Sequence, residues 1–181
     1  MRRVLCVVLL LLLVLGCKAT QHVPMAPRAA GVARVAGRGC TSEIKYNLAP
    51  DWSPAEVADL LAAMELWRTG TWGAACWVPS KAPGSLRVLR AANRQVLAVH
   101  TKAWPKVIGL YVASLPAVYV VAGAPLFSVA VHEFGHAMGI PHETDWQAPS
   151  FMHAEDNNDT PESRTELPYV DLRAFCLLHG C

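Results

Sequence analysis

The sequence of 181 residues predicts one α+β domain over residues 40–181. Three observations support this prediction. An alternating apolar run is followed by an amphipathic helical pattern, four short β-rich runs come after that helix, and a later helical stretch contains the residues HEFGHAMGIPH. A shorter helical pattern over residues 168–179 closes the chain.

The first strand is predicted in residues 40–48, where apolar and polar residues alternate as in a strand with one buried face. The first helix is predicted to begin at Pro54, because a serine that can cap it comes directly before and Glu56 can complete a capping box. Gly70 is expected to end this helix. The apolar face of the helix is predicted to consist of Val57, Leu60, Leu61, Met64 and Trp67.

Four short runs rich in β-branched residues follow the first helix, and Asn, Pro, Gly and Lys separate them. Each run has the length and composition of a strand. The four predicted strands are residues 86–90, 96–100, 107–112 and 118–121.

The stretch HEFGHAMGIPH contains the candidate metal ligands and the candidate catalytic residue. His132 and His136 are four residues apart, so on a helix both imidazoles lie on one face and can bind the same metal ion. Gly139 can end the helix and turn the chain back, which lets His142 return as a third ligand. Three protein ligands leave one position of a tetrahedral zinc site open, as in catalytic sites. Glu133 projects beside the metal and is predicted to be the general base.

This stretch matches the motif HExxHxxGxxH of the metzincin zinc peptidases at every fixed position, and the chain resembles that family. Residues 126–142 are similar to the active-site helix of the matrixins, whereas Glu143 is the residue that astacins carry after the third histidine. The resemblance implies a metzincin fold with a twisted mixed sheet, a backing helix and an active-site helix. It also implies a small lower subdomain with a Met-turn and a C-terminal helix, and Zn²⁺ bound by His132, His136 and His142.

The resemblance implies roles for further segments. The strand around residues 109–113 is expected to be an edge strand that pairs with an extended substrate, and an ordinary strand paired on both sides is the alternative. Met152 is assigned to the Met-turn, where its thioether packs beneath the imidazoles. Astacins carry a tyrosine two residues after this methionine, but Ala154 stands here, and His153 is a candidate for transition-state support.

Residues 155–159, with the sequence EDNND, offer several oxygen ligands. Matrixins often bind calcium, so a Ca²⁺ site is one interpretation of this segment. The spacing does not match an EF-hand loop, and a solvated turn is the alternative.

The N-terminal residues predict export. Residues 1–16 contain two arginines and an apolar run, and they resemble a bacterial lipoprotein signal peptide, with an ordinary signal peptide as the alternative. Cys17 would carry the lipid, and residues 17–39 would form a flexible tether. The predicted location is the bacterial cell envelope or the secreted fraction. The outer membrane is favoured because Lys18, rather than aspartate, follows Cys17.

Four cysteines remain in the predicted domain, and an even set in an exported protein predicts two disulfides. The pairing stays open among three possibilities. Cys40 bridged to the C-terminal region would join the two ends of the domain, and a local bridge between Cys176 and Cys181 is the alternative.

The charge balance of the predicted mature chain does not indicate a nucleic-acid partner. Without Arg2 and Arg3, the 16 basic residues fall to 14, which equals the 14 acidic residues, and this balance gives no support to nucleic-acid binding. We therefore expect a monomeric, zinc-dependent endopeptidase that acts on extended peptide or protein substrates. The alternative is a non-catalytic module that binds peptides or proteins on the same fold, and the complete set of histidines with Glu133 favours the enzyme.

Overall fold

The computed structural model describes residues 39–103, 105–154 and 166–181, which lie in one compact unit between residues 35 and 181. The predicted signal peptide, nearly all of the predicted tether and the predicted calcium-binding segment lie outside the described residues. Within the described ranges, no helix is long and apolar enough to cross a membrane.

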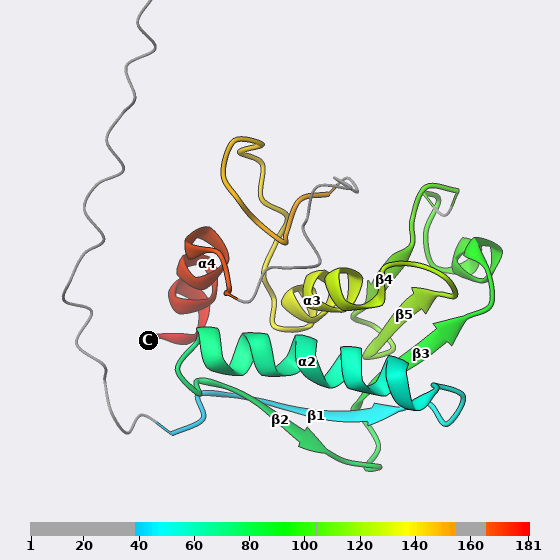
Figure 1. The fold of residues 1–181 in the computed structure, drawn as a ribbon, viewed down its shortest axis with the longest axis horizontal. Helices are drawn as coiled ribbons and strands as arrows, with labels where there is room; N and C mark the ends of the chain where they lie inside the picture. Colours follow the sequence, from blue (N-terminus) through cyan, green and yellow to red (C-terminus); the bar gives the residue numbers. More distant parts are fainter. Residues whose placement is uncertain (1–38, 104, 155–165) are drawn as a thin grey trace, which may run out of the picture. The chain divides into compact units, whose positions relative to one another are not determined.

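A mixed sheet of five strands, ordered β2-β1-β3-β5-β4, frames the described part of the domain (Figure 1). β1 (Ser42–Leu48) pairs in parallel with both β2 (Ala75–Pro79) and β3 (Leu86–Ala91). β3 pairs in parallel with β5 (Ala117–Val121), and β4 (Gly109–Val112) pairs antiparallel with β5. The predicted mixed sheet is confirmed, and β4 lies at its edge.

One predicted strand is wrong. Residues 96–100 fall largely within a 3₁₀ helix, η1 (Arg94–Val99). The side-chain oxygen of Asn93 accepts a hydrogen bond from Gln95 N at 2.9 Å, which closes the first turn of η1. β3 is already paired on both sides, so this run cannot add beside the strand that precedes it, and Val99 is 82% exposed. The strand β2, which the sequence pattern does not predict, completes the sheet instead.

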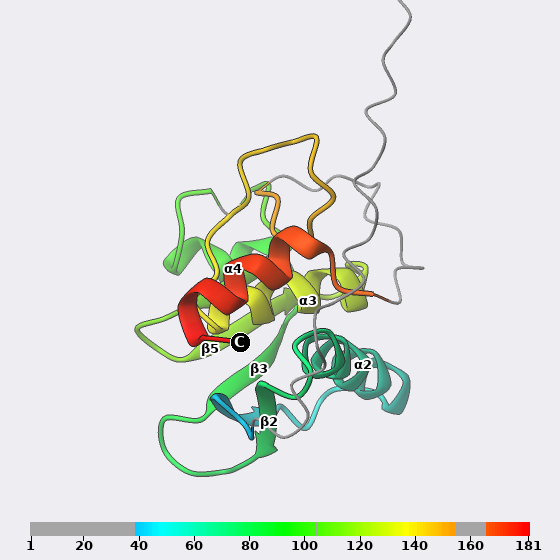
Figure 2. The same cartoon turned by 90° about the vertical axis from the view of Figure 1, so that its left-hand side faces the viewer.

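Two helices cover the same face of the sheet. α2 (Pro54–Gly70) begins and ends where the sequence predicts, with the capping box formed between Ser53 and Glu56. α3 (Leu126–Ala137) lies beside α2 and carries the HEFGH residues (Figures 1 and 2). α3 also contacts β4 and β5, so the active-site helix lies next to the edge of the sheet.

The interface between α2 and α3 centres on Trp67, which is fully buried. Its indole Nε1 donates a hydrogen bond to Val131 O at 2.9 Å, so the ring joins the two helices through both packing and a hydrogen bond. The prediction for one residue of the α2 face is wrong, because the Leu61 side chain is 42% exposed. The buried residues of α2 are Leu60, Ala63, Met64, Leu66 and Trp67.

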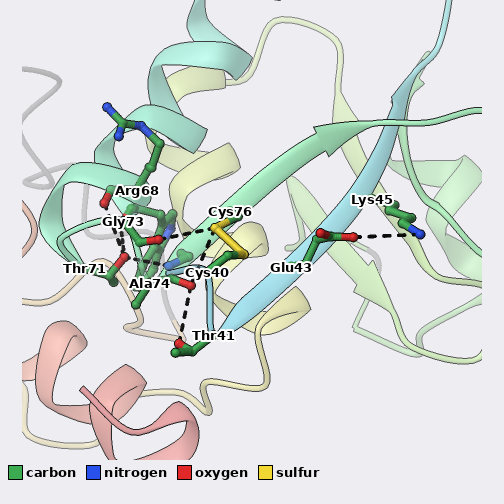
Figure 3. The surroundings of a disulfide bond; sticks show 11 residues. Cys40, Thr41, Glu43, Lys45, Arg68, Thr71, Gly73, Ala74 and Cys76 are labelled. Carbon is green, nitrogen blue, oxygen red and sulfur yellow. Dashed lines mark hydrogen bonds and ion pairs between the residues drawn. A yellow bond between two sulfur atoms is a disulfide. The ribbon is translucent and has the colours of Figure 1, made fainter. Parts of the chain in front are cut away.

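Two disulfides occur in the described residues, Cys40–Cys76 and Cys176–Cys181. The first connects Cys40, two residues before β1, with Cys76 near the start of the paired strand β2, across 36 residues of sequence (Figure 3). The predicted pair of disulfides is confirmed. Cys40 does not bridge to the C-terminal region, and the local bridge between Cys176 and Cys181 forms instead.

The last helix, α4 (Tyr169–His179), follows the predicted pattern and contacts α2 and the residue that follows α3. The Phe175 ring lies 6.5 Å from that of Trp67, measured between centroids. His179 Nε2 donates to Met138 O at 2.8 Å, directly after the end of α3. α4 therefore supports the end of the active-site helix, and it accounts for His179 without a role as a metal ligand.

Candidate metal centre and cleft

Three histidines converge at the end of α3. His132 and His136 are one turn apart on this helix, and Gly139, with a φ of +85°, ends it in the left-handed region as its sequence position predicts. The chain then returns so that His142 faces the helix, with His136 Nε2 and His142 Nε2 at 3.0 Å. One ring nitrogen from each histidine lies within 4.8 Å of the others. The structure therefore brings together all three histidines that the motif singles out.

Backbone carbonyls orient the two helical imidazoles. His132 Nδ1 lies 2.6 Å from Phe151 O, and His136 Nδ1 lies 2.8 Å from Ile140 O. A carbonyl oxygen only accepts, so Nδ1 carries the proton on both rings. Each Nε2 is left with the lone pair that a metal ion needs, which is the usual arrangement behind a metal-binding histidine.

The geometry and protonation of the cluster fit a zinc ion. Zinc–nitrogen bonds of about 2.0–2.1 Å in a tetrahedral site place neighbouring ligand atoms about 3.3 Å apart, close to the 3.0 Å between His136 and His142. Burial, together with the neighbouring His136, lowers the pKa of His132 to about 4. Burial also lowers the pKa values of His136 and His142. At neutral pH the rings are therefore neutral, which is the form that binds metal.

The turn after the cluster packs against α3 through Met152, which is 1% exposed. A Cβ at Gly135 would lie 3.0 Å from Met152 Cε and 3.1 Å from Trp67 Cζ2, and it would also collide with the Met152 sulfur. The helix can approach the turn this closely only because residue 135 has no side chain. Met152 thus packs against α3 at the residue just before His136, and its predicted place beneath the imidazoles stays a prediction.

A buried carboxylate holds this turn in place. Asp171 on α4 is 1% exposed and accepts hydrogen bonds from Ser150 Oγ at 2.5 Å and from Phe151 N at 2.8 Å. Ser150 Oγ in turn accepts from Met152 N at 2.8 Å. Phe151 O accepts a hydrogen bond from His132, so Phe151 connects Asp171 to the histidine cluster. Sequence reasoning missed Asp171, and its available signal was a carboxylate in the first turn of a largely apolar helix.

Glu133 lies beneath the edge strand and is 5% exposed. A Cβ at Gly109 of β4 would lie 2.7 Å from Glu133 Oε1 and would collide with the Val129 side chain. The backbone of β4 therefore approaches α3 so closely at this point that no side chain fits. This contact places the carboxylate between the histidine cluster and the edge strand.

A cleft of about 730 Å³ runs beside the cluster. The three histidines and Glu133 line it together with much of β4, so the candidate metal centre and the sheet edge face one shared space. The other lining residues are Thr101, Ala103, Lys106, residues 107–111, Ser128, Val129, Phe151, His153 and Ala154.

His153 forms part of the wall of this cleft. Its ring stacks on Trp146 with centroids 4.9 Å apart, and its Nε2 donates to Ala148 O at 2.9 Å. Its Nδ1 is buried and has no hydrogen-bond partner among the described residues. The stacking and the hydrogen bond explain the position of the ring, and a role in transition-state support stays a prediction.

The fold and the three-histidine site define a metzincin-type domain. Residues 27–180 match the family model described as Matrixin, and because this match covers most of the chain, the protein belongs to the matrixin family. The metzincin prediction is confirmed, and the matrixin side of the resemblance is the one that the family model supports.

Two known proteins are similar to parts of this chain. Matrix metalloproteinase-18 of Xenopus laevis is 42% identical over 55 residues, which are 30% of this chain and 11% of that protein, so the chain matches only a small part of its length. Among solved structures, High choriolytic enzyme 1, a hatching enzyme zinc-protease from Oryzias latipes (medaka fish), is 15% identical with a TM-score of 0.48. That similarity covers 77% of this chain and 90% of the other.

Proposed function

We propose that the protein is a zinc-dependent endopeptidase. The observation that carries this proposal is the cluster of three neutral imidazoles beside a buried carboxylate, at a cleft that an edge strand also lines. In this proposal His132, His136 and His142 hold the metal, and Glu133 is the general base. Membership of the matrixin family supports the assignment.

Each group has a defined role in the proposed reaction. Zinc, when bound, would polarise the scissile carbonyl and make water more acidic. Glu133 would accept a proton from the water as the water oxygen attacks the carbonyl carbon. The same carboxyl group would deliver that proton to the amide nitrogen as the C–N bond breaks. The carbonyls of Phe151 and Ile140 keep two imidazoles in the tautomer that binds metal.

The free side of β4 supports binding of the substrate in an extended form. Among the described strands, β4 pairs only with β5, and its residues 109–111 line the cleft. An extended peptide can add to such an edge through main-chain hydrogen bonds, which accept almost any sequence. We infer that substrates are unstructured segments of proteins or peptides.

Metal removal tests the proposed function. We expect the purified protein to cleave an unstructured protein at neutral pH and to lose this activity after treatment with a chelator. Once the chelator is removed, zinc equimolar to the protein should restore the activity. Activity is measured by gel and mass spectrometry, and bound zinc by elemental analysis. A chelator already saturated with zinc serves as the control. Undiminished cleavage by protein shown to contain no metal would refute the proposal.

Gly109→Ala tests the contact between β4 and Glu133. The added methyl group must displace the carboxylate or the Val129 side chain, so we expect kcat to fall about 10- to 100-fold, as misplaced catalytic groups commonly cause. Zinc content should stay at the wild-type level, because the atoms nearest to the added methyl group belong to Val129 and Glu133 and not to a histidine. Gly39→Ala is the control, since a Cβ there meets nothing within 4 Å. Wild-type kcat in Gly109→Ala would contradict this account.

A further inference from the structure

One wall of the cleft carries a single cationic side chain, Lys106. Apart from Glu133, which is buried, the described lining residues include no other Asp, Glu, Lys or Arg. Lys106 is exposed and forms no ion pair within the described part of the chain. Among the described lining residues, the exposed charge is therefore positive, and a bound divalent metal ion would add to it.

The loop that carries Lys106 is anchored. Lys106 N donates to Ala103 O at 3.0 Å, which closes a turn, and Arg94 on η1 donates from Nη1 to Pro105 O at 2.9 Å. The first hydrogen bond closes the turn, and the second connects it to η1 at the residue immediately before Lys106. The 3₁₀ helix that replaces the predicted strand thus supports the part of the cleft wall that holds this lysine.

The position of Lys106 along the cleft follows from Gly109. A general base must lie within hydrogen-bond reach of the water it activates, so the scissile bond lies opposite Gly109, where β4 meets Glu133. β4 begins at Gly109, and Lys106 lies in the turn three residues before it. Val121 N donates to Ile108 O at 2.8 Å, which holds the chain between this turn and β4 against the sheet. Three residues of chain span at most about 10 Å, the length of about three residues of an extended peptide, so Lys106 lies within three substrate positions of the scissile bond.

We propose that Lys106 forms a subsite for an acidic side chain, two or three residues from the bond that is cleaved. This inference rests on the proposed peptidase function and adds a substrate preference to it. Because Lys106 forms no ion pair with a described residue, its ammonium group can pair with a substrate carboxylate without breaking any of the described ion pairs. A peptide that adds antiparallel to β4 places a residue two or three positions after the scissile bond at this subsite, and a parallel peptide places a residue two or three positions before that bond there.

Matched peptides test the subsite. Peptides that differ only by glutamate or glutamine, at each of three positions on either side of the cleaved bond, are compared by kcat/KM. We expect glutamate to be favoured about two- to fivefold at one position, two or three residues from that bond, because exposed ion pairs are weak. The preference should shrink at high salt.

Two lysines in the same loop provide a matched comparison. Lys106→Gln should remove the preference, and Lys106→Glu should reverse it in favour of a lysine peptide. Lys102→Gln should retain it, because Lys102 is also exposed but does not line the cleft. A wild type without the preference, a preference that persists in Lys106→Gln, or an equal loss in Lys102→Gln would overturn the inference while cleavage itself continued.

Measurements of peptide affinity test the acidic subsite independently of the proposed peptidase activity. If the wild type cleaves none of the peptides, the proposed function fails, and fluorescence anisotropy with zinc-loaded protein then measures the affinity of the same peptides. Tighter binding of glutamate peptides that depends on Lys106 would support an acidic subsite in a cleft that only binds. Equal affinities for the two peptide series would overturn it.

Discussion

Glu133→Gln is expected to lower kcat about 10²- to 10⁴-fold, the usual contribution of a general base. The amide has nearly the same shape as the carboxylate but cannot take a proton from water. Because Glu133 is not one of the three clustered ligands, the variant should bind as much zinc as the wild type. The measurement is kcat on an unstructured protein, together with zinc content by elemental analysis.

Glu65→Gln is the matched control for this substitution, because it makes the same chemical change on the exposed side of α2 and should leave kcat unchanged. Activity of Glu133→Gln within a few-fold of wild type would mean that another group acts as the base. If wild type and variant hold zinc equally and are both inert across a broad peptide library, the non-catalytic binding module becomes the better interpretation.

Asp171→Ala is expected to destabilise the metal-free protein by about 2–6 kcal/mol, because each of the two buried donors left unpaired costs about 1–3 kcal/mol. Those donors are Ser150 Oγ and Phe151 N. The Phe151 carbonyl would also lose its fixed position, so we expect zinc affinity to fall about 10- to 100-fold through the poorly oriented His132. Denaturant unfolding in chelator gives the first value, and zinc titration against a competing chelator gives the second.

The variant Asp171→Asn keeps the volume of the side chain and one acceptor, so it provides folded protein for the zinc titration if Asp171→Ala does not fold. Asp59→Ala, on the exposed side of α2, should change neither quantity by more than about 0.5 kcal/mol. A loss of stability in Asp171→Asn with wild-type zinc affinity would show that Asp171 supports only the fold and does not position His132.

The errors in predicting the fold have a common physical origin. The run at residues 96–100 has β-branched residues, yet the Asn93 cap and the already paired β3 make it part of η1. Leu61 fits the helical period, but the neighbouring elements do not cover it. In both cases local propensity was outweighed by the availability of a partner, which depends on the rest of the fold. The predictions of a lipid on Cys17 and of a calcium site stay predictions, because both fall outside the described residues.

The sequence by itself determined the features that depend on short spacings. The interval between His132 and His136, the glycine that ends α3 and the capping box of α2 each act within a few residues, so their geometry can be worked out from the chain alone. The same spacings carried the resemblance to the metzincins, which the family match then confirmed.

Only the tertiary structure decided which distant residues meet. The place of β4 at the sheet edge, the pairing of Cys40 with Cys76, and the path from Asp171 through Phe151 to His132 all join segments far apart in the chain. The same is true of Gly109, whose missing side chain admits Glu133. Such contacts follow from strand order and helix packing, which local periodicity does not encode.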